Sequence, residues 1–223
     1  MEIEGVIFDL DGTLVNTIED IGDSANAMLK RNGFELHTTA EYLKWIGNGA
    51  AKLVENAVGS EVAPDQLMAY VKQFKEVYSE NLHTKSRLYG GIPEMLDQLS
   101  ERRVKLAILS NKPHHLTEQV AEFYLSGWEF HPVFGQRDNI PRKPDPAAAL
   151  EIADILKIKK EKTVLVGDSL GDLKTAEAAG MIPVGVTWGY GIPGTNSQNG
   201  YYLVDNPGEL VTLLSDLMGN DIR

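Results

Sequence analysis

The chain has 223 residues, of which 43% are hydrophobic and 24% are charged, and its formal net charge is -11 at pH 7. This composition is typical of a globular protein with a sizeable core, and the acidic balance argues against nucleic acid as a partner, because a phosphate-backbone binder needs a basic surface. The sequence has no cysteine and no apolar run near the roughly 20 residues that span a bilayer, so we expect no thiol chemistry, no membrane partner and a cytoplasmic location.

The first element in the chain is a buried strand that ends in two carboxylates. An apolar, β-branched run over residues 3–8 is followed by Asp9, Asp11, Gly12 and Thr13. At the carboxyl end of a strand in an α/β sheet, side chains and loop amides converge on the crevice that binds ligands. Asp9 and Asp11 would both lie there. Two carboxylates at such a short separation repel each other unless one is protonated or a cation lies between them.

After the first strand the pattern is helical up to about residue 87. Either Asn16 or Thr17 is a plausible N-cap of the first helix, and three further helical stretches fall between residues 39 and 82. No strand pattern appears in this region. A purely helical block directly after the first strand predicts an inserted bundle over 16–87 rather than a crossover helix.

From residue 88 onward, strand and helix patterns alternate to the end of the chain. Repeated strand–helix units predict a doubly wound, Rossmann-like parallel sheet with helices on both faces. We therefore expect an α/β core built from 1–15 and 88–223, with a helical cap inserted between them. The expected strands are 104–109, 132–134, 163–166, 183–187 and 201–204, and the expected helices include 93–103, 116–125 and 207–218.

Four polar clusters follow the apolar strands or their connections. Because the carboxyl ends of parallel strands share one edge of the sheet, we expect these clusters to meet. They would supply carboxylates for a hard cation such as Mg2+, donors for an anion, one fixed positive charge and a carboxylate nucleophile able to form an aspartyl-phosphate. The clusters are Asp9/Asp11, Ser110/Asn111, Lys143 and Asp168/Asp172, and the donors are Thr13, Ser110 and the amides near Gly12 and Asn111.

With these clusters in this order, the sequence resembles the haloacid dehalogenase superfamily of phosphatases over nearly its whole length. The helical block matches the cap that a large subset of the superfamily carries after its first motif. More narrowly, residues 45–50, 110–113 and 188–191 resemble phosphoglycolate phosphatases. The four superfamily motifs correspond to Asp9-Leu10-Asp11-Gly12-Thr13-Leu14, Ser110-Asn111, Lys143-Pro144 and Gly167-Asp168-Ser169-Leu170-Gly171-Asp172.

The resemblance implies a role for each of these residues. Asp9 would attack the phosphorus, and Asp11 would protonate the leaving oxygen and then deprotonate the water that hydrolyses the aspartyl-phosphate. Asp9, the backbone carbonyl of Asp11 and Asp168 would hold Mg2+, with Asp172 as a direct or water-mediated ligand. The transferring phosphoryl oxygens would be held by Ser110, Lys143 and the amides of Gly12 and Asn111.

The helical block offers a candidate contact to the rest of the substrate. The Gly47-Asn48-Gly49 turn either presents its amides or the Asn48 side chain to a substrate carboxylate, or simply links two helices. Lys52, one helical turn further along the chain, is a weaker candidate of the same kind. Selectivity for the substrate is therefore expected to lie in the cap.

These features predict a Mg2+-dependent hydrolase of a small phosphorylated metabolite, monomeric or homodimeric, with 2-phosphoglycolate as the first substrate to test. The enzyme alternatives are a pyrophosphatase and a phosphosugar mutase, which needs a second phosphate site in the cap; Lys44 and Lys52 are candidates for it, but no clear basic cluster exists. A third alternative is an inactive phosphate-binding regulatory protein. That alternative expects loss of Asp9, Asp11 or the metal-binding aspartates, and all of them are present.

Overall fold

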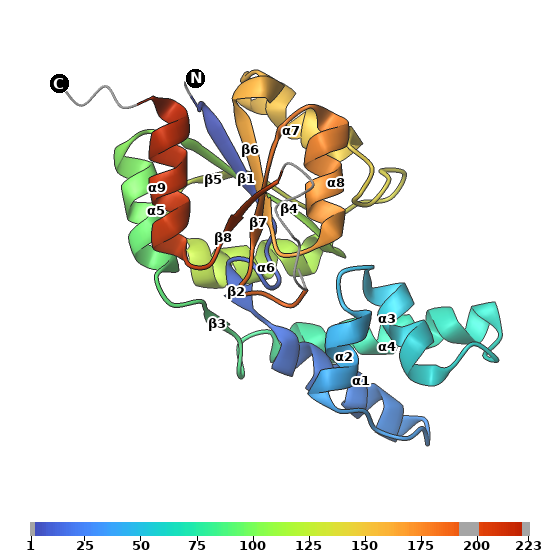
Figure 1. Ribbon diagram of the computed structural model, residues 1–223. Helices are drawn as coiled ribbons and strands as arrows, with labels where there is room; N and C mark the ends of the chain where they lie inside the picture. Colours follow the sequence, from blue (N-terminus) through green and yellow to red (C-terminus); the bar gives the residue numbers. More distant parts are fainter. Residues whose placement is uncertain (1–2, 192–200, 220–223) are drawn as a thin grey trace.

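The computed structural model describes residues 3–191 and 201–219 (Figure 1). Six parallel strands form one sheet in the order β5-β4-β1-β6-β7-β8, which extends in both directions from β1. This arrangement confirms the predicted doubly wound parallel sheet. The loop expected over 189–200 lies, from residue 192, outside the described residues. The strands are β1 (Gly5–Phe8), β4 (Lys105–Pro113), β5 (Phe130–Gln136), β6 (Thr163–Gly167), β7 (Ile182–Val186) and β8 (Tyr202–Val204).

The register of the central strands brings the ends of β1 and β6 to nearly the same level, whereas β4 continues beyond it to Pro113. Phe8, the last residue of β1, lies opposite Ile108 of β4 on one side and Val166 of β6 on the other. The polar residues that follow each of these three positions therefore emerge at one edge of the sheet. This register is the reason that clusters far apart in the sequence can form one site.

Helices cover both faces of the sheet because the strand side chains alternate between the faces. Val6 and Phe8 pack with the first hydrophobic cluster, whereas Ile7 between them packs with the second. The first cluster includes residues of α5 (Ile92–Glu101), α6 (His114–Leu125) and α9 (Pro207–Met218). The second includes residues of α7 (Ala147–Leu156) and α8 (Leu170–Ala179), and a short 3-10 helix, Lys160–Lys162, precedes β6.

Four further helices form a lobe beyond the carboxyl edge of the sheet, which we call the helical lobe (lower part of Figure 1). Three of these helices bury several apolar residues, as the periodicity predicts, and the shortest, Thr39–Trp45, buries Tyr42. The lobe follows the first strand in the chain, in the region where the sequence has a helical pattern. Its helices are α1 (Ile18–Arg31), α2 (Thr39–Trp45), α3 (Ala50–Val58) and α4 (Pro64–Asn81).

The two chain segments that connect the lobe to the sheet pair with each other. Val15–Asn16 (β2) and Arg87–Leu88 (β3) form a two-stranded antiparallel ribbon. The prediction of no strand between residues 14 and 88 was wrong at these two ends, because strands of two residues are too short to show an alternating pattern. The ribbon places both crossings between the lobe and the sheet side by side.

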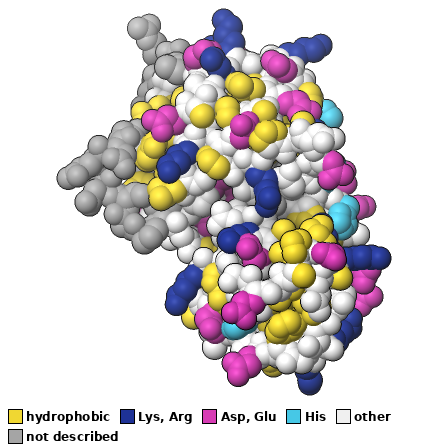
Figure 2. Space-filling model, turned by 90° about the vertical axis from the view of Figure 1, so that its right-hand side faces the viewer, with side chains coloured by type: hydrophobic (Ala, Val, Ile, Leu, Met, Phe, Trp, Pro, Cys, Tyr) yellow, Lys and Arg dark blue, Asp and Glu magenta, His cyan; other side chains and the backbone are white. Residues whose placement is uncertain are grey.

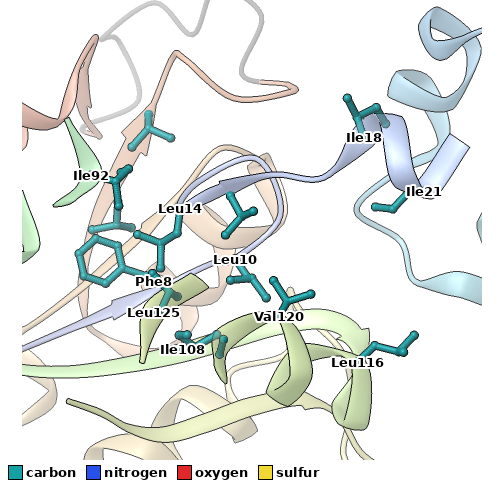
Figure 3. Packing of buried hydrophobic residues seen from close by; sticks show 14 of the residues in the cluster. Phe8, Leu10, Leu14, Ile18, Ile21, Ile92, Ile108, Leu116, Val120 and Leu125 are labelled. Carbon is teal, nitrogen blue, oxygen red and sulfur yellow. The ribbon is translucent and has the colours of Figure 1, made fainter. Parts of the chain in front are cut away.

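Hydrophobic packing also continues from the sheet into the lobe. Leu10 and Leu14 in the loop after β1 are fully buried, and the same cluster contains Ile18 and Ile21 of α1. In Figure 3, Leu10 and Leu14 lie beside the sheet, and Ile18 and Ile21 lie further along at the first turns of α1. The lobe is therefore held over the edge of the sheet by apolar contacts as well as by its two connections.

The surface carries charges of both signs. On the face shown in Figure 2, acidic and basic side chains are interspersed, and hydrophobic side chains gather on the lower, helical lobe. Leu43 and Met68 are among the exposed large hydrophobic residues of the lobe. Within the described part of the chain, no helix combines the length and the apolar character needed to cross a membrane.

Candidate active site

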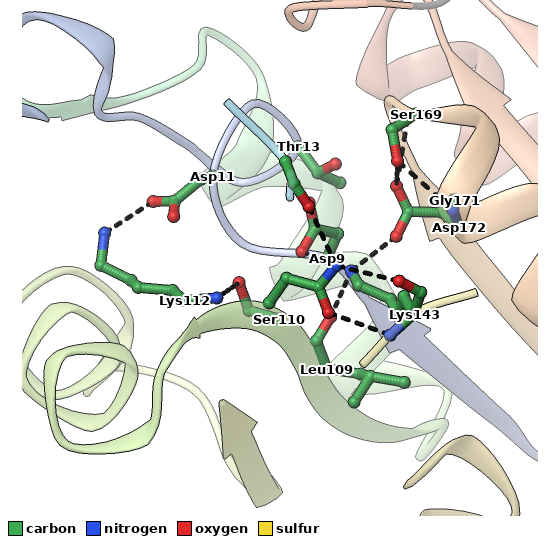
Figure 4. Close-up of polar contacts among 12 residues, drawn as sticks. Asp9, Asp11, Thr13, Leu109, Ser110, Lys112, Lys143, Ser169, Gly171 and Asp172 are labelled. Carbon is green, nitrogen blue, oxygen red and sulfur yellow. Dashed lines mark hydrogen bonds and ion pairs between the residues drawn. The ribbon is translucent and has the colours of Figure 1, made fainter. Parts of the chain in front are cut away.

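Three buried carboxylates meet at the carboxyl edge of the sheet. Asp9 follows β1, Asp168 follows β6, and Asp172 lies in the first turn of α8; each offers a carboxylate oxygen within 4.8 Å of the others. The amino group of Lys143 donates to Asp9 Oδ1 at 2.7 Å and to Asp172 Oδ1 at 2.6 Å (Figure 4). Among the described residues, one ammonium group contacts this cluster, so three ionised carboxylates would leave it an excess of two formal negative charges.

The surroundings of the cluster disfavour these negative charges. Burial raises the pKa of Asp9 and of Asp168, and the neighbouring carboxylates raise both further, against the opposing effect of Lys143. Burial alone would lower the pKa of Lys143, but Asp172 and Asp9 outweigh it and keep this pKa above its ordinary value. A compact set of carboxylate oxygens that lacks positive charge fits a hard divalent cation such as Mg2+.

Without a divalent cation, we expect the stability of the protein to fall as the pH rises. The folded-state pKa values of Asp9 and Asp168 lie above their ordinary value of 3.8, so the folded protein holds more protons than the unfolded chain, and this stabilisation is lost as pH rises through the raised pKa values. The melting temperature in EDTA should therefore be lower at about pH 8.5 than at about pH 5.5 by several degrees.

Two comparisons test the origin of this pH effect. Added Mg2+ should reduce the fall, because a bound cation stabilises the ionised carboxylates. The variant Asp168→Asn should also show a smaller fall in EDTA, since it removes one of the two carboxyl groups involved. A melting temperature in EDTA that rises with pH over this range would contradict the charge balance described above.

The sequence around Asp172 fixes the orientation of its carboxylate. Ser169 and Asp172 form a capping box at the start of α8, in which the backbone N–H and the hydroxyl of Ser169 both donate to Asp172 Oδ2. Oδ1 is thereby directed to Lys143. A Cβ atom on Gly167 would lie 2.2 Å from the Asp172 carboxyl carbon, so only glycine permits this approach.

Asp11 lies outside the carboxylate cluster. Its Oδ1 accepts hydrogen bonds from Thr17 Oγ1 at 2.7 Å and from Lys112 Nζ at 2.9 Å. Figure 4 shows its side chain directed toward Lys112 and away from Asp9. Two acids that are two positions apart in the sequence therefore have different partners: Asp9 faces the cluster, and Asp11 faces the entry of α1 and the end of β4.

The predicted anion donors lie at the same edge of the sheet, but some of them already donate hydrogen bonds to groups of the protein. Ser110 is buried and lines the same cavity as Asp9. Thr13 Oγ1 donates to Asp168 Oδ1 at 3.4 Å, so it contacts a carboxylate of the cluster. The amide of Gly12 donates to the carbonyl of Val15 at 2.9 Å, within its own loop. Gly12 has a φ of +90°, and a Cβ there would lie 2.3 Å from Asp168 Oδ2.

The turn between α2 and α3 contacts the sheet edge through its main chain. Asn111 Nδ2 donates to the carbonyl of Gly47 at 2.9 Å, and Arg142 Nη1 donates to the carbonyl of Asn48 at 2.7 Å. Asn111 Oδ1 also accepts from the amide of Lys143 at 3.0 Å. Gly47 and Gly49 line the cavity, whereas Asn48 is not among the described residues that line it.

Replacing Arg142 by alanine is expected to raise KM about three- to tenfold, with a smaller effect on kcat, because the turn loses one of these two hydrogen bonds. Steady-state kinetics of phosphate release measures both constants. Arg102→Ala is the matched control, since Arg102 is an exposed arginine that donates to Ser215 far from the cavity. An unchanged KM in Arg142→Ala would contradict a functional role for this contact.

Tyr190 connects the carboxylate cluster to the first turn of α1. Its hydroxyl oxygen accepts from the amides of Thr17 at 2.6 Å and Ile18 at 3.0 Å, which explains why α1 begins without a side-chain cap from Thr17. The hydroxyl also lies 3.2 Å from Asn16 Oδ1, to which it donates. The amide of Tyr190 donates to Asp168 Oδ2 at 2.6 Å.

A cavity separates the carboxylate cluster from the helical lobe. Its floor is polar and its lobe side is mainly apolar, so one end suits a charged group and the other suits carbon. The floor includes Asp9, Asp11, Ser110, Lys112, Lys143 and Asp168, and the lobe side includes Ile21, Leu43, Ile46, Ala50, Leu53, Phe74 and Tyr78.

Comparison with known proteins gives consistent matches. A family model for haloacid dehalogenase-like hydrolases matches residues 6–186. A phosphoglycolate phosphatase from Psychrobacter arcticus is 32% identical over 201 residues, 85% of this chain and 86% of that protein. Another from Haemophilus influenzae is 33% identical over 216 residues, 93% and 96% of the two chains. The crystal structure of a predicted phosphoglycolate phosphatase from Haemophilus somnus has a TM-score of 0.87 at 28% identity, with 96% and 98% of the chains covered.

The chain therefore belongs to the haloacid dehalogenase-like hydrolases, a family of enzymes. Within that family, its curated relatives given above are named phosphoglycolate phosphatases. The family resemblance inferred from the four motifs is thus confirmed, and so is the expectation of a hydrolase.

Proposed function

We propose that the protein is a Mg2+-dependent phosphomonoester hydrolase that acts, through an aspartyl-phosphate, on 2-phosphoglycolate or a similar small phosphate ester. The observation that carries this proposal is the group of three buried carboxylates around one lysine at the floor of the cavity. The names of the curated relatives supply the substrate. Phosphoryl transfer needs chiefly positioned charges, and this floor provides them.

The carboxylate cluster is the proposed cation site. Asp9, Asp168 and the backbone carbonyl of Asp11 would hold Mg2+, with Asp172 as a direct or water-mediated ligand. When bound, the cation supplies positive charge to the phosphoryl oxygens and to the carboxylates around it. Lys143, already fixed between Asp9 and Asp172, supplies a second positive charge beside the phosphoryl group.

In the proposed reaction, Asp9 is the nucleophile. Lys143 engages its Oδ1, and Oδ2 has no hydrogen-bond donor among the described residues, so this oxygen can attack phosphorus. A bond forms between Asp9 and phosphorus while the ester oxygen leaves with its electron pair and takes a proton from Asp11. Ser110 and the amide of Asn111 would hold the phosphoryl oxygens, and Thr13 would keep the Asp168 carboxylate in place.

The second step returns the enzyme to its starting state. Asp11 accepts a proton from water, the water oxygen forms a bond to phosphorus, and the bond between phosphorus and Asp9 breaks to give inorganic phosphate. One residue thus acts first as acid and then as base, which restores its proton at the end of the cycle. Asp11 suits this task because its side chain lies outside the carboxylate cluster, at the cavity floor.

The helical lobe is proposed to act as a cap domain over 16–87, with the core formed by 1–15 and 88–223. The ribbon of β2 and β3 would be the hinge, since both crossings lie in it. Closure of the cap over the cavity would exclude water while Asp11 is placed, and opening would release the products. The hydrogen bonds from Asn111 and Arg142 to the α2–α3 turn support this assignment.

The cavity favours a phosphatase over the two enzyme alternatives. A phosphosugar mutase or a pyrophosphatase must hold a second phosphate on the lobe side of the cavity, where the described lining is mainly apolar. Lys44 and Lys52, the candidates for that role, are not among the lining residues. Lys52 instead pairs with Glu55 at 2.8 Å on the surface of α3.

A phosphate-release screen tests the proposed function. The purified protein is incubated with 2-phosphoglycolate, sugar phosphates, nucleotides and pyrophosphate, each with Mg2+ and with EDTA. We expect the highest kcat/KM for 2-phosphoglycolate with Mg2+ and no release in EDTA. Release that persists in EDTA would refute the metal-dependent mechanism, a preference for pyrophosphate or sugar phosphates would refute the substrate, and no release at all would favour the regulatory alternative.

A further inference from the structure

We propose that Lys112 binds a carboxylate on the leaving group and so selects phosphate esters of hydroxy acids. This inference rests on the proposed phosphatase function and assigns the selectivity to a residue of the sheet edge rather than to the cap alone. Lys112 lies in β4, two positions after Ser110, and its side chain lines the cavity.

Lys112 is a buried cation at the junction between the two halves of the cavity. Its side chain is only 3% exposed. Its amino group lies 2.9 Å from Asp11 Oδ1, donates to the hydroxyl of Tyr78 in α4, and stands 4.5 Å from the centroid of the Tyr78 ring. These contacts compensate the cost of burying an ammonium group and fix its position at the junction.

The position of Lys112 fits a carboxylate next to the ester oxygen. Asp11 is the proposed proton donor to the leaving oxygen, so that oxygen must lie beside the Asp11 carboxyl group. In a phosphoric ester of a 2-hydroxy acid, the carboxylate is attached to the carbon that bears this oxygen. The amino group of Lys112, a hydrogen-bond distance from Asp11, is therefore within reach of such a carboxylate.

The hydrogen bonds of the two lysines that line the cavity in the described chain differ. Lys143 donates to Asp9, Asp172 and the carbonyl of Leu109, which uses all three N–H groups of its ammonium. Lys112 donates to two groups among the described residues, Asp11 and Tyr78, so a third N–H group is left for a substrate carboxylate. The lobe side is mainly apolar among the described lining residues, and the Tyr78 hydroxyl on that side already accepts from Lys112. The start of α3 adds positive potential, because Gly49 and Ala50 line the cavity and the helix has neither a side-chain cap nor an acidic residue in its first turn.

A matched pair of substrates tests this proposal. 2-Phosphoglycolate and 2-hydroxyethyl phosphate have the same length and similar leaving oxygens, but only the first carries a carboxylate. In the variant Lys112→Met, we expect kcat/KM for 2-phosphoglycolate to fall about 10- to 100-fold more than for 2-hydroxyethyl phosphate, mainly through KM, because one charge-assisted hydrogen bond is lost. Lys112→Arg should recover part of the preference, and Lys52→Met, which removes a lysine outside the cavity, should retain it.

The outcomes separate this role from two others. If both substrates lose kcat/KM equally in Lys112→Met, Lys112 acts only by positioning Asp11, and the proposal is overturned. If the unmodified enzyme prefers 2-hydroxyethyl phosphate, the cavity selects uncharged leaving groups, which also overturns it. Melting temperatures of the variants check that the fold is intact, and Lys112→Gln provides a second neutral variant if the methionine variant does not fold.

A binding measurement separates failure of this inference from failure of the proposed function. Calorimetric titration of Asp9→Asn with each ester, in the presence of Mg2+, requires no turnover. The preference for 2-phosphoglycolate should be present in Asp9→Asn and lost in the double variant Asp9→Asn/Lys112→Met. If no ester is hydrolysed but this preference is found, the hydrolase assignment fails and the Lys112 site stands; if the single variant shows no preference, the Lys112 site fails.

Discussion

The variant Asp9→Asn is expected to release phosphate at least about 10⁴-fold more slowly than the unmodified enzyme, because an amide oxygen cannot form the aspartyl-phosphate. The same variant should melt at an unchanged or higher temperature. Burial is the main cause of the raised pKa of Asp9, so an ionised carboxylate at this position destabilises the fold when no cation is present. Replacing it with a neutral group of the same shape removes that cost.

This pair of measurements distinguishes a catalytic role from a structural one. Phosphate release from 2-phosphoglycolate with Mg2+ gives the activity, and thermal unfolding in EDTA gives the stability. Asp138→Asn is the matched control, since Asp138 is an exposed aspartate outside the cavity, and it should change neither quantity. Loss of activity together with a marked loss of stability would instead indicate that Asp9 is needed for the fold.

Asp11→Asn should have the second largest effect, and its size should depend on the leaving group. General acid catalysis contributes about 10²–10⁴-fold, so we expect a loss of that order for 2-phosphoglycolate, whose leaving oxygen needs a proton. With p-nitrophenyl phosphate, whose leaving group departs without one, the first step should be nearly unaffected. Hydrolysis of the aspartyl-phosphate would still lack its base, so a burst of p-nitrophenol should precede slow turnover.

Stopped-flow absorbance of p-nitrophenol and steady-state phosphate release together measure these two steps. The side chain of Asp11 accepts from Thr17 and Lys112, and asparagine keeps the oxygen that both contacts require. Equal losses for the two esters, without a burst, would show that Asp11 does not act as the acid. This profile differs from that expected for Lys112→Met, which depends on the charge of the leaving group rather than on its basicity.

The fold could be predicted because its signals are local and repeated. The strand expected over 163–166 is β6, Thr163–Gly167, and the helix expected over 207–218 is α9, Pro207–Met218. A buried strand and an amphipathic helix each impose a period on the sequence, and alternation of the two predicts a parallel sheet. The β2–β3 ribbon has no such period and was missed.

The floor of the candidate site could be predicted by the same logic. Asp9 and Asp168 follow β1 and β6, and Ser110 lies in the neighbouring β4 beyond the level of Phe8, so topology alone brings the three residues together. Lys143 does not follow a strand directly. It was predicted as a site residue because Lys143-Pro144 matches one of the four superfamily motifs. The roles assigned to these residues in the reaction stay proposals.

The contacts of other site residues could not be predicted, because they are long-range, although the resemblance singles out the stretches 110–113 and 188–191. Tyr190 contacts Thr17 across 173 positions of sequence, and Lys112 contacts Asp11 across 101. Arg142 resembles any surface arginine until the α2–α3 turn is placed beside it. No period, spacing or cap pattern encodes such pairings, since they depend on how two lobes are placed relative to each other.

The contacts of Tyr190 have a consequence for the energetics of the protein. One residue holds Asp168 through its amide and the first turn of α1 through its hydroxyl, so a shift at one end is carried to the other. Coupling of this kind is reciprocal. If a ligand that favours one position of α1 changes the free energy of binding at Asp168, then binding at Asp168 changes the binding free energy of that ligand by the same amount. We therefore expect binding at Asp168 and the position of α1 to be coupled rather than independent.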